Sequence, residues 1–197
     1  MITPRLITAC DDGLLVELSE LLIDSVHGGA SVGFRSLGWD VLTLDIQPAF
    51  SPDFVADVRS WVYPSHLPVP DVVWASPPCT EFSRADLPFY RDSASPDMSI
   101  VFGCLDVIFS LSPRFWVLEN VRGAIPFFRP FLGSPRASFR PYFFWGFFPD
   151  VGSPSSISWR SKESVGGSSR RSAVRAVIPF SLSRSFALAC MGQRVLL

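Results

Sequence analysis

Short apolar runs alternate with amphipathic stretches along much of the chain. Gly13–Leu18 has the character of a buried strand, although Leu14–Val26 also fits a single amphipathic helix. Met98–Leu111 has helical spacing, and Pro179 is placed to start a last helix that runs to about Cys190. Four further apolar runs predict strands: Trp39–Ile46, Asp53–Val58, Pro70–Ser76 and Arg114–Val121.

Strands separated by helical stretches are typical of an α/β protein with a mostly parallel central sheet and helices on both faces. In such sheets, ligands bind beyond the carboxyl ends of the strands. The pattern places four polar residues at those ends: Asp45, Asp57, Cys79 and Glu119. We therefore expect these positions to build the functional site.

The second half of the chain has a different character. Residues 124–154 are rich in Phe, Pro and Gly, and Phe-rich segments more often belong to a core than to a surface. Ser153–Arg171 is rich in Ser and Gly, which predicts a loop. The interpretation is an α/β core over residues 1–123, a small Arg- and Phe-rich insertion over 124–171, and a C-terminal helix over 172–197 that completes the core.

Composition and length fit a globular domain, with 197 residues of which 48% are hydrophobic and 18% charged. No apolar run approaches the ~18–20 residues of a membrane-spanning helix, and the segment "MITPRLITACDDG" turns acidic too early for a secretory signal. The four cysteines are widely spaced and form no CxxC pair. This spacing favours reduced thiols in a cytosol over a disulfide framework or a zinc site.

Charge is distributed unevenly along the chain. Residues 1–110 carry five Arg and fifteen Asp or Glu, whereas residues 111–197 carry twelve Arg or Lys and three Asp or Glu. Eleven of those twelve cations are Arg, whose planar guanidinium suits phosphate. The basic half indicates either a polyanionic partner or a solvated face that balances the acidic half.

Cys79 and Glu119 are the two residues whose context suggests reaction chemistry. A lone cysteine is most often a small buried hydrophobe, but Cys79 follows a strand that two prolines stop, where a parallel sheet presents its functional loops. A nucleophilic thiolate needs such a positioned, partly exposed sulfur. Glu119 ends an apolar strand as either a solvated carboxylate or a partly desolvated acid.

The motifs around these residues resemble those of the DNA (cytosine-5) methyltransferases. "SPPCTEFS" resembles the proline–cysteine motif of that family, and "LENV" resembles its Glu-Asn-Val motif, with Glu119 placed 40 residues after Cys79. "GWDVLTLDI" and "VADV" are similar to the second and third cofactor motifs, and "FRPYFFWGFFP" followed by "RAVIPFSLSRSFALA" is similar to the C-terminal part of compact, phage-type members. The resemblance implies a Rossmann-like, S-adenosylmethionine-dependent methyltransferase fold.

The resemblance also implies roles for individual residues. Cys79 would add to C6 of a cytosine swung out of double-stranded DNA, and Glu119 would hydrogen-bond N3 and the exocyclic amine. On the cofactor side, the ribose would be bound by Asp45, the adenine amine by Asp57, and the ring by Ile46 and Val58, with Pro78 lining the site and Glu17, Gly28 and Gly29 forming the first cofactor motif. On the substrate side, the implied contacts are Ser76, Pro77, Phe82, Ser83, Asn120, Val121 and Arg122.

Two family motifs depart from the expected pattern. The first cofactor motif fits in two registers: in one, Glu17 is the acid and Ser19 replaces the family's Phe, and in the other, "DSVHGGASVGF" aligns with Asp24 in place of that Phe. We prefer the first, because Gly13–Leu18 makes the better strand. The Gln-x-Arg-x-Arg motif of larger relatives has no visible counterpart.

These observations lead to one principal hypothesis and two alternatives. The principal hypothesis is a small phage- or prophage-type DNA cytosine-5 methyltransferase, monomeric and located in a bacterial or phage-infected host cytosol, with no membrane association and no metal site. The first alternative is a non-catalytic DNA-binding relative that has lost cofactor binding. The second is an RNA cytosine-5 methyltransferase that uses the same chemistry.

Overall fold

The structure is a computed structural model that describes residues 5–10, 29–85, 96–152 and 177–192. The chain divides into two compact units. One comprises residues 1–6, 14–41 and 149–197, and the other comprises residues 7–13 and 42–148. Each unit is described below by itself.

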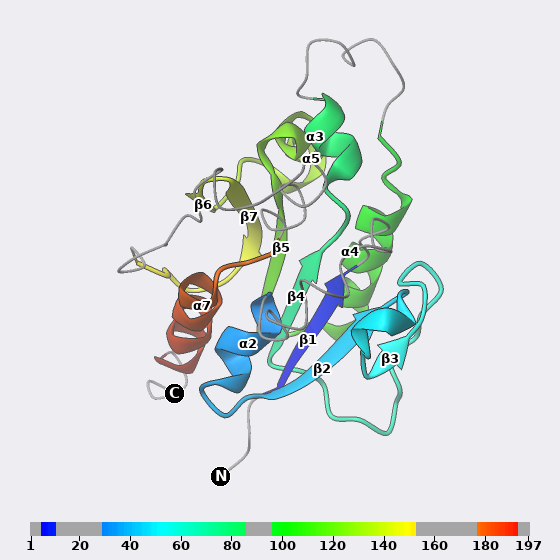
Figure 1. Cartoon of the computed structure of the whole chain (residues 1–197), viewed down its shortest axis with the longest axis vertical. Helices are drawn as coiled ribbons and strands as arrows, with labels where there is room; N and C mark the ends of the chain where they lie inside the picture. Colours follow the sequence, from blue (N-terminus) through cyan, green and yellow to red (C-terminus); the bar gives the residue numbers. More distant parts are fainter. Residues whose placement is uncertain (1–4, 11–28, 86–95, 153–176, 193–197) are drawn as a thin grey trace. The chain divides into compact units, whose positions relative to one another are not determined.

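Helices and strands alternate along the described residues (Figure 1). In chain order the elements are β1 (Arg5–Cys10), α2 (Ala30–Arg35), β2 (Asp40–Asp45), η1 (Pro48–Phe50), β3 (Phe54–Val55), β4 (Val72–Ser76), α3 (Thr80–Ala85), α4 (Ser99–Leu111), β5 (Phe115–Val121), η3 (Arg122–Ala124), α5 (Ile125–Leu132), β6 (Ala137–Phe139), β7 (Tyr142–Phe147) and α7 (Phe180–Gly192). The predicted α/β class is confirmed.

The strands form one seven-stranded sheet in the order β3-β2-β1-β4-β5-β7-β6. The pairs β2–β3 and β4–β5 are parallel, whereas β5–β7 and β6–β7 are antiparallel. The sheet is therefore mixed. Because β4 and β5 are parallel neighbours, the segments that follow Ser76 and Val121 leave the sheet at the same edge.

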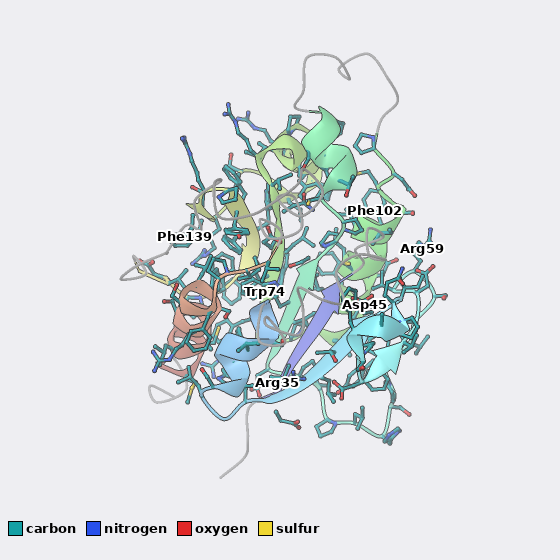
Figure 2. The ribbon with its side chains drawn as sticks, in the orientation of Figure 1. Arg35, Asp45, Arg59, Trp74, Phe102 and Phe139 are labelled. Carbon is teal, nitrogen blue, oxygen red and sulfur yellow. The ribbon has the colours of Figure 1, made fainter. Side chains whose placement is uncertain are left out.

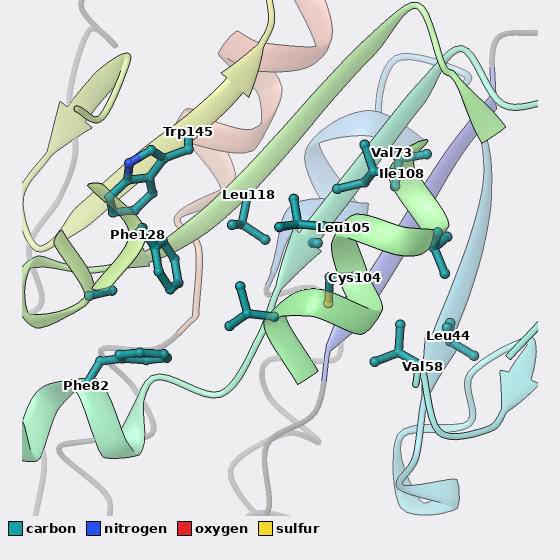
Figure 3. Close-up of a cluster of buried hydrophobic side chains, with 14 residues drawn as sticks. Leu44, Val58, Val73, Phe82, Cys104, Leu105, Ile108, Leu118, Phe128 and Trp145 are labelled. Carbon is teal, nitrogen blue, oxygen red and sulfur yellow. The ribbon is translucent and has the colours of Figure 1, made fainter. Parts of the chain in front are cut away.

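The core of the 42–148 unit lies between the sheet and α4 (Figure 3). α4 presents apolar residues at helical spacing, with Val101, Cys104, Leu105 and Ile108 all buried. On the strands, Val73 and Ala75 of β4 alternate with residues of the other face, as a sheet covered by a helix requires. Burying these side chains fixes the position of the β4 and β5 ends.

The Phe-rich stretch supplies part of the same core. Trp145 of β7 is 1% exposed and packs at 4.9 Å against the ring of Phe128 in α5. The indole N–H of Trp145 donates to the carbonyl of Gly133 at 3.2 Å. The predicted boundary between residues 123 and 124 thus falls inside one compact unit, because residues 42–148 cluster together.

In the other unit, α2 packs closely against α7. Gly33 is the contact point, because a Cβ atom at this position would lie 2.1 Å from Ser183 Oγ and 2.3 Å from the backbone nitrogen of Arg184. Backbone cannot yield as a flexible side chain does. The absence of a side chain at Gly33 therefore sets the separation of the two helices.

We expect Gly33→Ala to lower the free energy of unfolding by about 1–3 kcal/mol, because the added methyl group forces α2 away from α7. Urea unfolding followed by circular dichroism measures the change. Ser31→Ala, on the same helix, is the matched control and should leave stability within about 0.5 kcal/mol. An unchanged midpoint for Gly33→Ala would show that the helices do not pack this closely.

The predicted elements that fall on described residues agree with the structure, whereas β1, α2, α3, α5, β6 and β7 were not predicted. The four predicted strands correspond to β2, β3, β4 and β5, and the helices predicted over 98–111 and from Pro179 correspond to α4 and α7. The strand or helix predicted over residues 13–26 and the loop predicted over residues 153–171 lie outside the described residues. None of the described helices is long and apolar enough to cross a membrane.

Candidate active site

The loop that carries Cys79 begins where β4 leaves the sheet. Pro77 is buried and Pro78 half-buried, and their rings fix φ and remove two backbone donors, so the loop has few alternative conformations. Cys79 is half-buried, is not disulfide-bonded, and directly precedes α3. Its carbonyl accepts a 2.8 Å hydrogen bond from the N–H of Ser83. The cysteine is thereby held at the junction between a rigid turn and a helix.

Asn120 connects this loop to the end of β5. Its side chain is fully buried, and its amide nitrogen donates to the carbonyl of Pro77 at 3.0 Å. Its amide oxygen accepts from the N–H of Val121 at 2.9 Å. The hydrogen bond to Pro77 spans 43 residues of sequence and places the Cys79 loop beside the carboxyl end of β5. Asn120 therefore positions the loop.

Glu119 and Tyr142 lie on the same face of the sheet. Phe144 pairs with Glu119 and Tyr142 pairs with Val121 in the β5–β7 register, so Glu119 and Tyr142 are diagonal neighbours. Both side chains are buried, with exposures of 7% and 5%. Burial, together with the negative charges of Glu119 and then Cys79, raises the pKa of Tyr142 above its ordinary value. The thiol and the carboxyl are therefore close enough to the phenol to disfavour its ionised form.

The other predicted substrate contacts have diverse environments. Ser76 accepts a 3.0 Å hydrogen bond from the indole N–H of Trp74. Phe82 is 2% exposed and packs against the rings of Phe127 and Phe128, so it anchors α3 in the core. Ser83 and Arg122 are exposed and Val121 is half-buried.

On the cofactor side, Asp45 lies at the carboxyl end of β2. It is 7% exposed, and its carboxylate accepts a 2.7 Å hydrogen bond from the N–H of Gln47. The carbonyl of Asp45 accepts from the N–H of Ala56, which holds the segment after β3 alongside β2. Ile46 follows with 37% exposure, whereas the Val58 side chain belongs to the buried core.

Asp57 follows β3 and pairs with Arg59. The guanidinium Nε donates to both carboxylate oxygens, at 2.9 and 3.0 Å. Hydrogen bonds from the side chain and then the backbone of Arg59 hold the pKa of Asp57 below its usual value. The carboxylate stays ionised, and β2 and β3 present two acidic groups at their carboxyl ends.

The predicted first cofactor motif is only partly described. Glu17 and Gly28 lie outside the described residues. Gly29 directly precedes α2 with a φ of +102°, a conformation that favours glycine, and its N–H donates to the carbonyl of Ile178 at 3.3 Å. It belongs to the unit formed by residues 1–6, 14–41 and 149–197. Within the described part of the chain, no cluster of three or more His, Cys, Asp or Glu could hold a metal ion.

Tyr142 and Arg59 were not among the residues predicted from the sequence. Tyr142 begins a run of β-forming residues, "YFFWGF", between Pro141 and Phe148-Pro149, which is a strand signal. Arg59 stands two residues after Asp57, a spacing at which an arginine can contact a carboxylate that ends a strand. Neither signal reveals the contacts of Tyr142 or Arg59 by itself, because those contacts depend on the folded backbone.

Comparison with known proteins gives one match to a curated sequence. The chain is 28% identical over 112 residues to the protein of Frog virus 3 (isolate Goorha) named "Probable DNA (cytosine-5)-methyltransferase". Over about half its length the chain is therefore similar to a protein assigned to the DNA (cytosine-5) methyltransferases. The match covers 50% of this chain and 51% of the viral methyltransferase, so the chain spans about half the length of that relative. No family model matches the sequence.

A solved structure also aligns with the chain. It is the crystal structure of an E. coli protein described as a "putative DNA modification methyltransferase encoded within prophage". The alignment has a TM-score of 0.45 and 17% sequence identity, and it covers 74% of this chain and 47% of that chain.

The Asn120–Pro77 contact gives a prediction for the site. Asn120→Ala leaves the Pro77 carbonyl without its side-chain donor, and we expect the free energy of unfolding to fall by about 1–3 kcal/mol. We also expect Cys79 to react faster with iodoacetamide, because the loop loosens. Urea unfolding and mass-resolved alkylation measure the two effects, with the exposed Ser83→Ala as control. Unchanged stability and unchanged alkylation would show that the contact does not hold the loop.

Proposed function

We propose that the chain transfers a methyl group from S-adenosylmethionine to C5 of a cytosine in double-stranded DNA. The observation that carries the proposal is the Asn120–Pro77 hydrogen bond, which brings a half-buried cysteine beside the strand end that bears a buried glutamate. Attack on a pyrimidine ring needs both groups around one base-sized site. The relation to the viral protein named above supports the same assignment.

In the proposed mechanism, Cys79 supplies the nucleophile. The target cytosine leaves the base stack, because its C6 atom cannot be reached inside the duplex. The thiolate forms a bond to C6, and the electron pair of the C5–C6 double bond moves towards C5. The carboxyl group of Glu119 hydrogen-bonds N3 and the exocyclic amine, which stabilises the charge that develops in the ring.

The second half of the reaction restores the aromatic base. When bound, S-adenosylmethionine supplies the methyl group as an electrophile to C5. A base then removes the C5 proton, the C5–C6 double bond re-forms, and the thiolate of Cys79 leaves C6. The buried surroundings of Glu119 exclude water from the site and strengthen its hydrogen bonds to the ring.

The described residues fit the adenosine part of this cofactor. A carboxylate only accepts hydrogen bonds, which suits a ribose diol and an adenine amine, and Asp45 and Asp57 follow the neighbouring strands β2 and β3. Ile46 is exposed enough to cover one face of the ring, and Val58 contributes less because it packs in the core. We assign Pro78 to the wall between the cofactor and Cys79, and Glu17, Gly28 and Gly29 to the first cofactor motif.

We propose that the sheet is the Rossmann-like sheet of a methyltransferase, mostly parallel with β7 as its reversed strand. The order β3-β2-β1-β4-β5-β7-β6 supports this proposal, because it places a crossover between β1 and β4, where open α/β sheets bind ligands. Cys79 follows β4 and Asp45 ends β2, the strands on either side of β1.

DNA would meet the edge formed by η3 and the β6–β7 hairpin. Arg122 follows β5, and the pairing of Val121 with Tyr142 brings the turn that contains Arg140 next to it. Both arginines are exposed, and guanidinium groups at such an edge suit backbone phosphates. We assign target recognition to residues 124–171, and direct substrate contacts to this edge and to Ser76, Pro77 and Ser83.

Transfer of labelled methyl groups tests the proposed function. With S-adenosylmethionine, we expect label in a cytosine-containing duplex and none in the same duplex with 5-methylcytosine at every cytosine. If label appears only in RNA of the same sequence, the substrate is RNA and not DNA. Tight DNA binding without any transfer would favour the non-catalytic relative and contradict the proposal.

A further inference from the structure

Arg59 holds the carboxylate of Asp57 from two directions. The backbone N–H of Arg59 donates to Oδ1 at 2.9 Å, and the guanidinium Nε donates to the same oxygen at 2.9 Å. The guanidinium Nη2 forms a short contact with Oδ2. Such a grip fixes both the direction of the side chain and the plane of the carboxylate.

Arg59 is in turn tied to α4. Its Nη1 donates to the hydroxyl of Ser99 at 3.4 Å, and this hydroxyl donates to Asp97 at 2.9 Å. Gly103 of α4 packs closely against Arg59, because a Cβ atom at this glycine would lie 3.0 Å from the Cα of Arg59. Arg59 reaches from the segment after β3 towards solvent beside α4 (Figure 2). The orientation of Asp57 is therefore coupled to a 13-residue helix in the core of the unit.

The donors of Arg59 leave the carboxylate of Asp57 with part of its acceptor capacity. An ionised carboxylate has about four lone-pair positions. Oδ1 accepts from the backbone N–H and from Nε, and Oδ2 accepts from Nη2 and from the same, shared Nε, so only three N–H groups are engaged. The side chain of Asp57 is 28% exposed, so a ligand can reach the carboxylate.

We propose that Arg59 is a positioning residue of the cofactor site, which fixes the carboxylate of Asp57 as the acceptor for the 6-amino group of the adenine. This inference rests on the proposed function. An exposed ion pair contributes little to folding stability, but a fixed acceptor loses no further orientational freedom when the ligand binds. A fixed, acceptor-only group favours a 6-amino purine and disfavours a 6-oxo purine, whose carbonyl lone pairs face the carboxylate.

Calorimetry with two cofactor analogues tests the proposal. S-adenosylhomocysteine carries the 6-amino group, and S-inosylhomocysteine carries a 6-oxo group. We expect the full-length wild-type chain to prefer the amino analogue by at least about tenfold, and Arg59→Ala to reduce this preference by about tenfold. Arg59→Lys keeps the charge without the planar grip, and it should also lose most of the preference. The melting temperature of Arg59→Ala should fall by less than about 4 °C.

Arg114→Ala is the matched control, because Arg114 lies in the same unit with its guanidinium over the ring of Phe115. It should leave the preference unchanged. If Arg59→Ala weakens the binding of both analogues by the same factor, Arg59 has a merely structural role and the proposal is overturned. An unchanged affinity of Arg59→Ala for the amino analogue would overturn it as well. Absence of binding by the wild-type chain is a different result, because it would contradict the proposed use of the cofactor itself.

Discussion

Cys79→Ser is expected to lower the rate of methyl transfer to DNA by at least about a thousandfold. A serine hydroxyl is a far weaker nucleophile near neutral pH than a cysteine thiol, and the proposed reaction cannot begin without a bond to C6. The substitution changes one atom of a half-buried side chain, so the fold should persist. The measurement is the initial rate of label transfer from S-adenosylmethionine to a cytosine-containing duplex, with DNA affinity measured in parallel.

Cys104→Ala is the control for the loss of a thiol. Cys104 is 3% exposed on α4 and packs in the core of the same unit. Its replacement should retain methyl transfer and lower the free energy of unfolding by about 1 kcal/mol. A Cys79→Ser variant with a normal rate, or a folded Cys104→Ala variant without activity, would contradict the assignment of the nucleophile.

Glu119→Gln should have the second largest effect, a reduction of methyl transfer by about a hundred- to a thousandfold. The amide has nearly the shape of the carboxyl group, so the β5–β7 pairing and the burial of residue 119 should be preserved. The glutamine amide cannot hold the proton or the negative charge that the carboxyl group of Glu119 presents to N3 of the ring. Because Glu119 acts on the ring rather than on DNA binding, the turnover number should fall while duplex affinity stays near that of the wild type.

Asp106→Asn provides a matched control for Glu119→Gln. Asp106 is exposed on α4, and its conversion to the amide removes one charge from the same unit without touching the site. Its rate should remain within about twofold of the wild type. If Glu119→Gln is equally active, the carboxyl group at the end of β5 has no part in the reaction.

Local pattern was sufficient to predict the elements that place the site. The apolar runs that end at Asp45, Ser76 and Val121 are strands in the structure, and the helical spacing of residues 98–111 marks α4. The α/β pattern placed Cys79 and Glu119 at strand ends, and the parallel pairing of β4 with β5 in the structure makes those ends neighbours.

The remaining features depend on pairing between distant segments. "YFFWGF" is a strand because β5 lies beside it, whereas its composition alone also suits an aromatic surface. Phe82 stands next to the site in sequence, yet it packs into the core because α5 brings Phe127 and Phe128 against it. Asn120 binds the Pro77 carbonyl across 43 residues. No local periodicity encodes such contacts.

The most direct test of the central claim is to trap the covalent adduct. A duplex with 5-fluorocytosine at the target position cannot lose its C5 substituent as a proton, so the bond between the enzyme and C6 should persist in the presence of S-adenosylmethionine. Intact-mass measurement and peptide mapping should place the DNA adduct on Cys79, and Cys79→Ser should abolish it. An adduct on another residue, or methyl transfer to ordinary DNA without any adduct on the fluorinated duplex, would contradict the account.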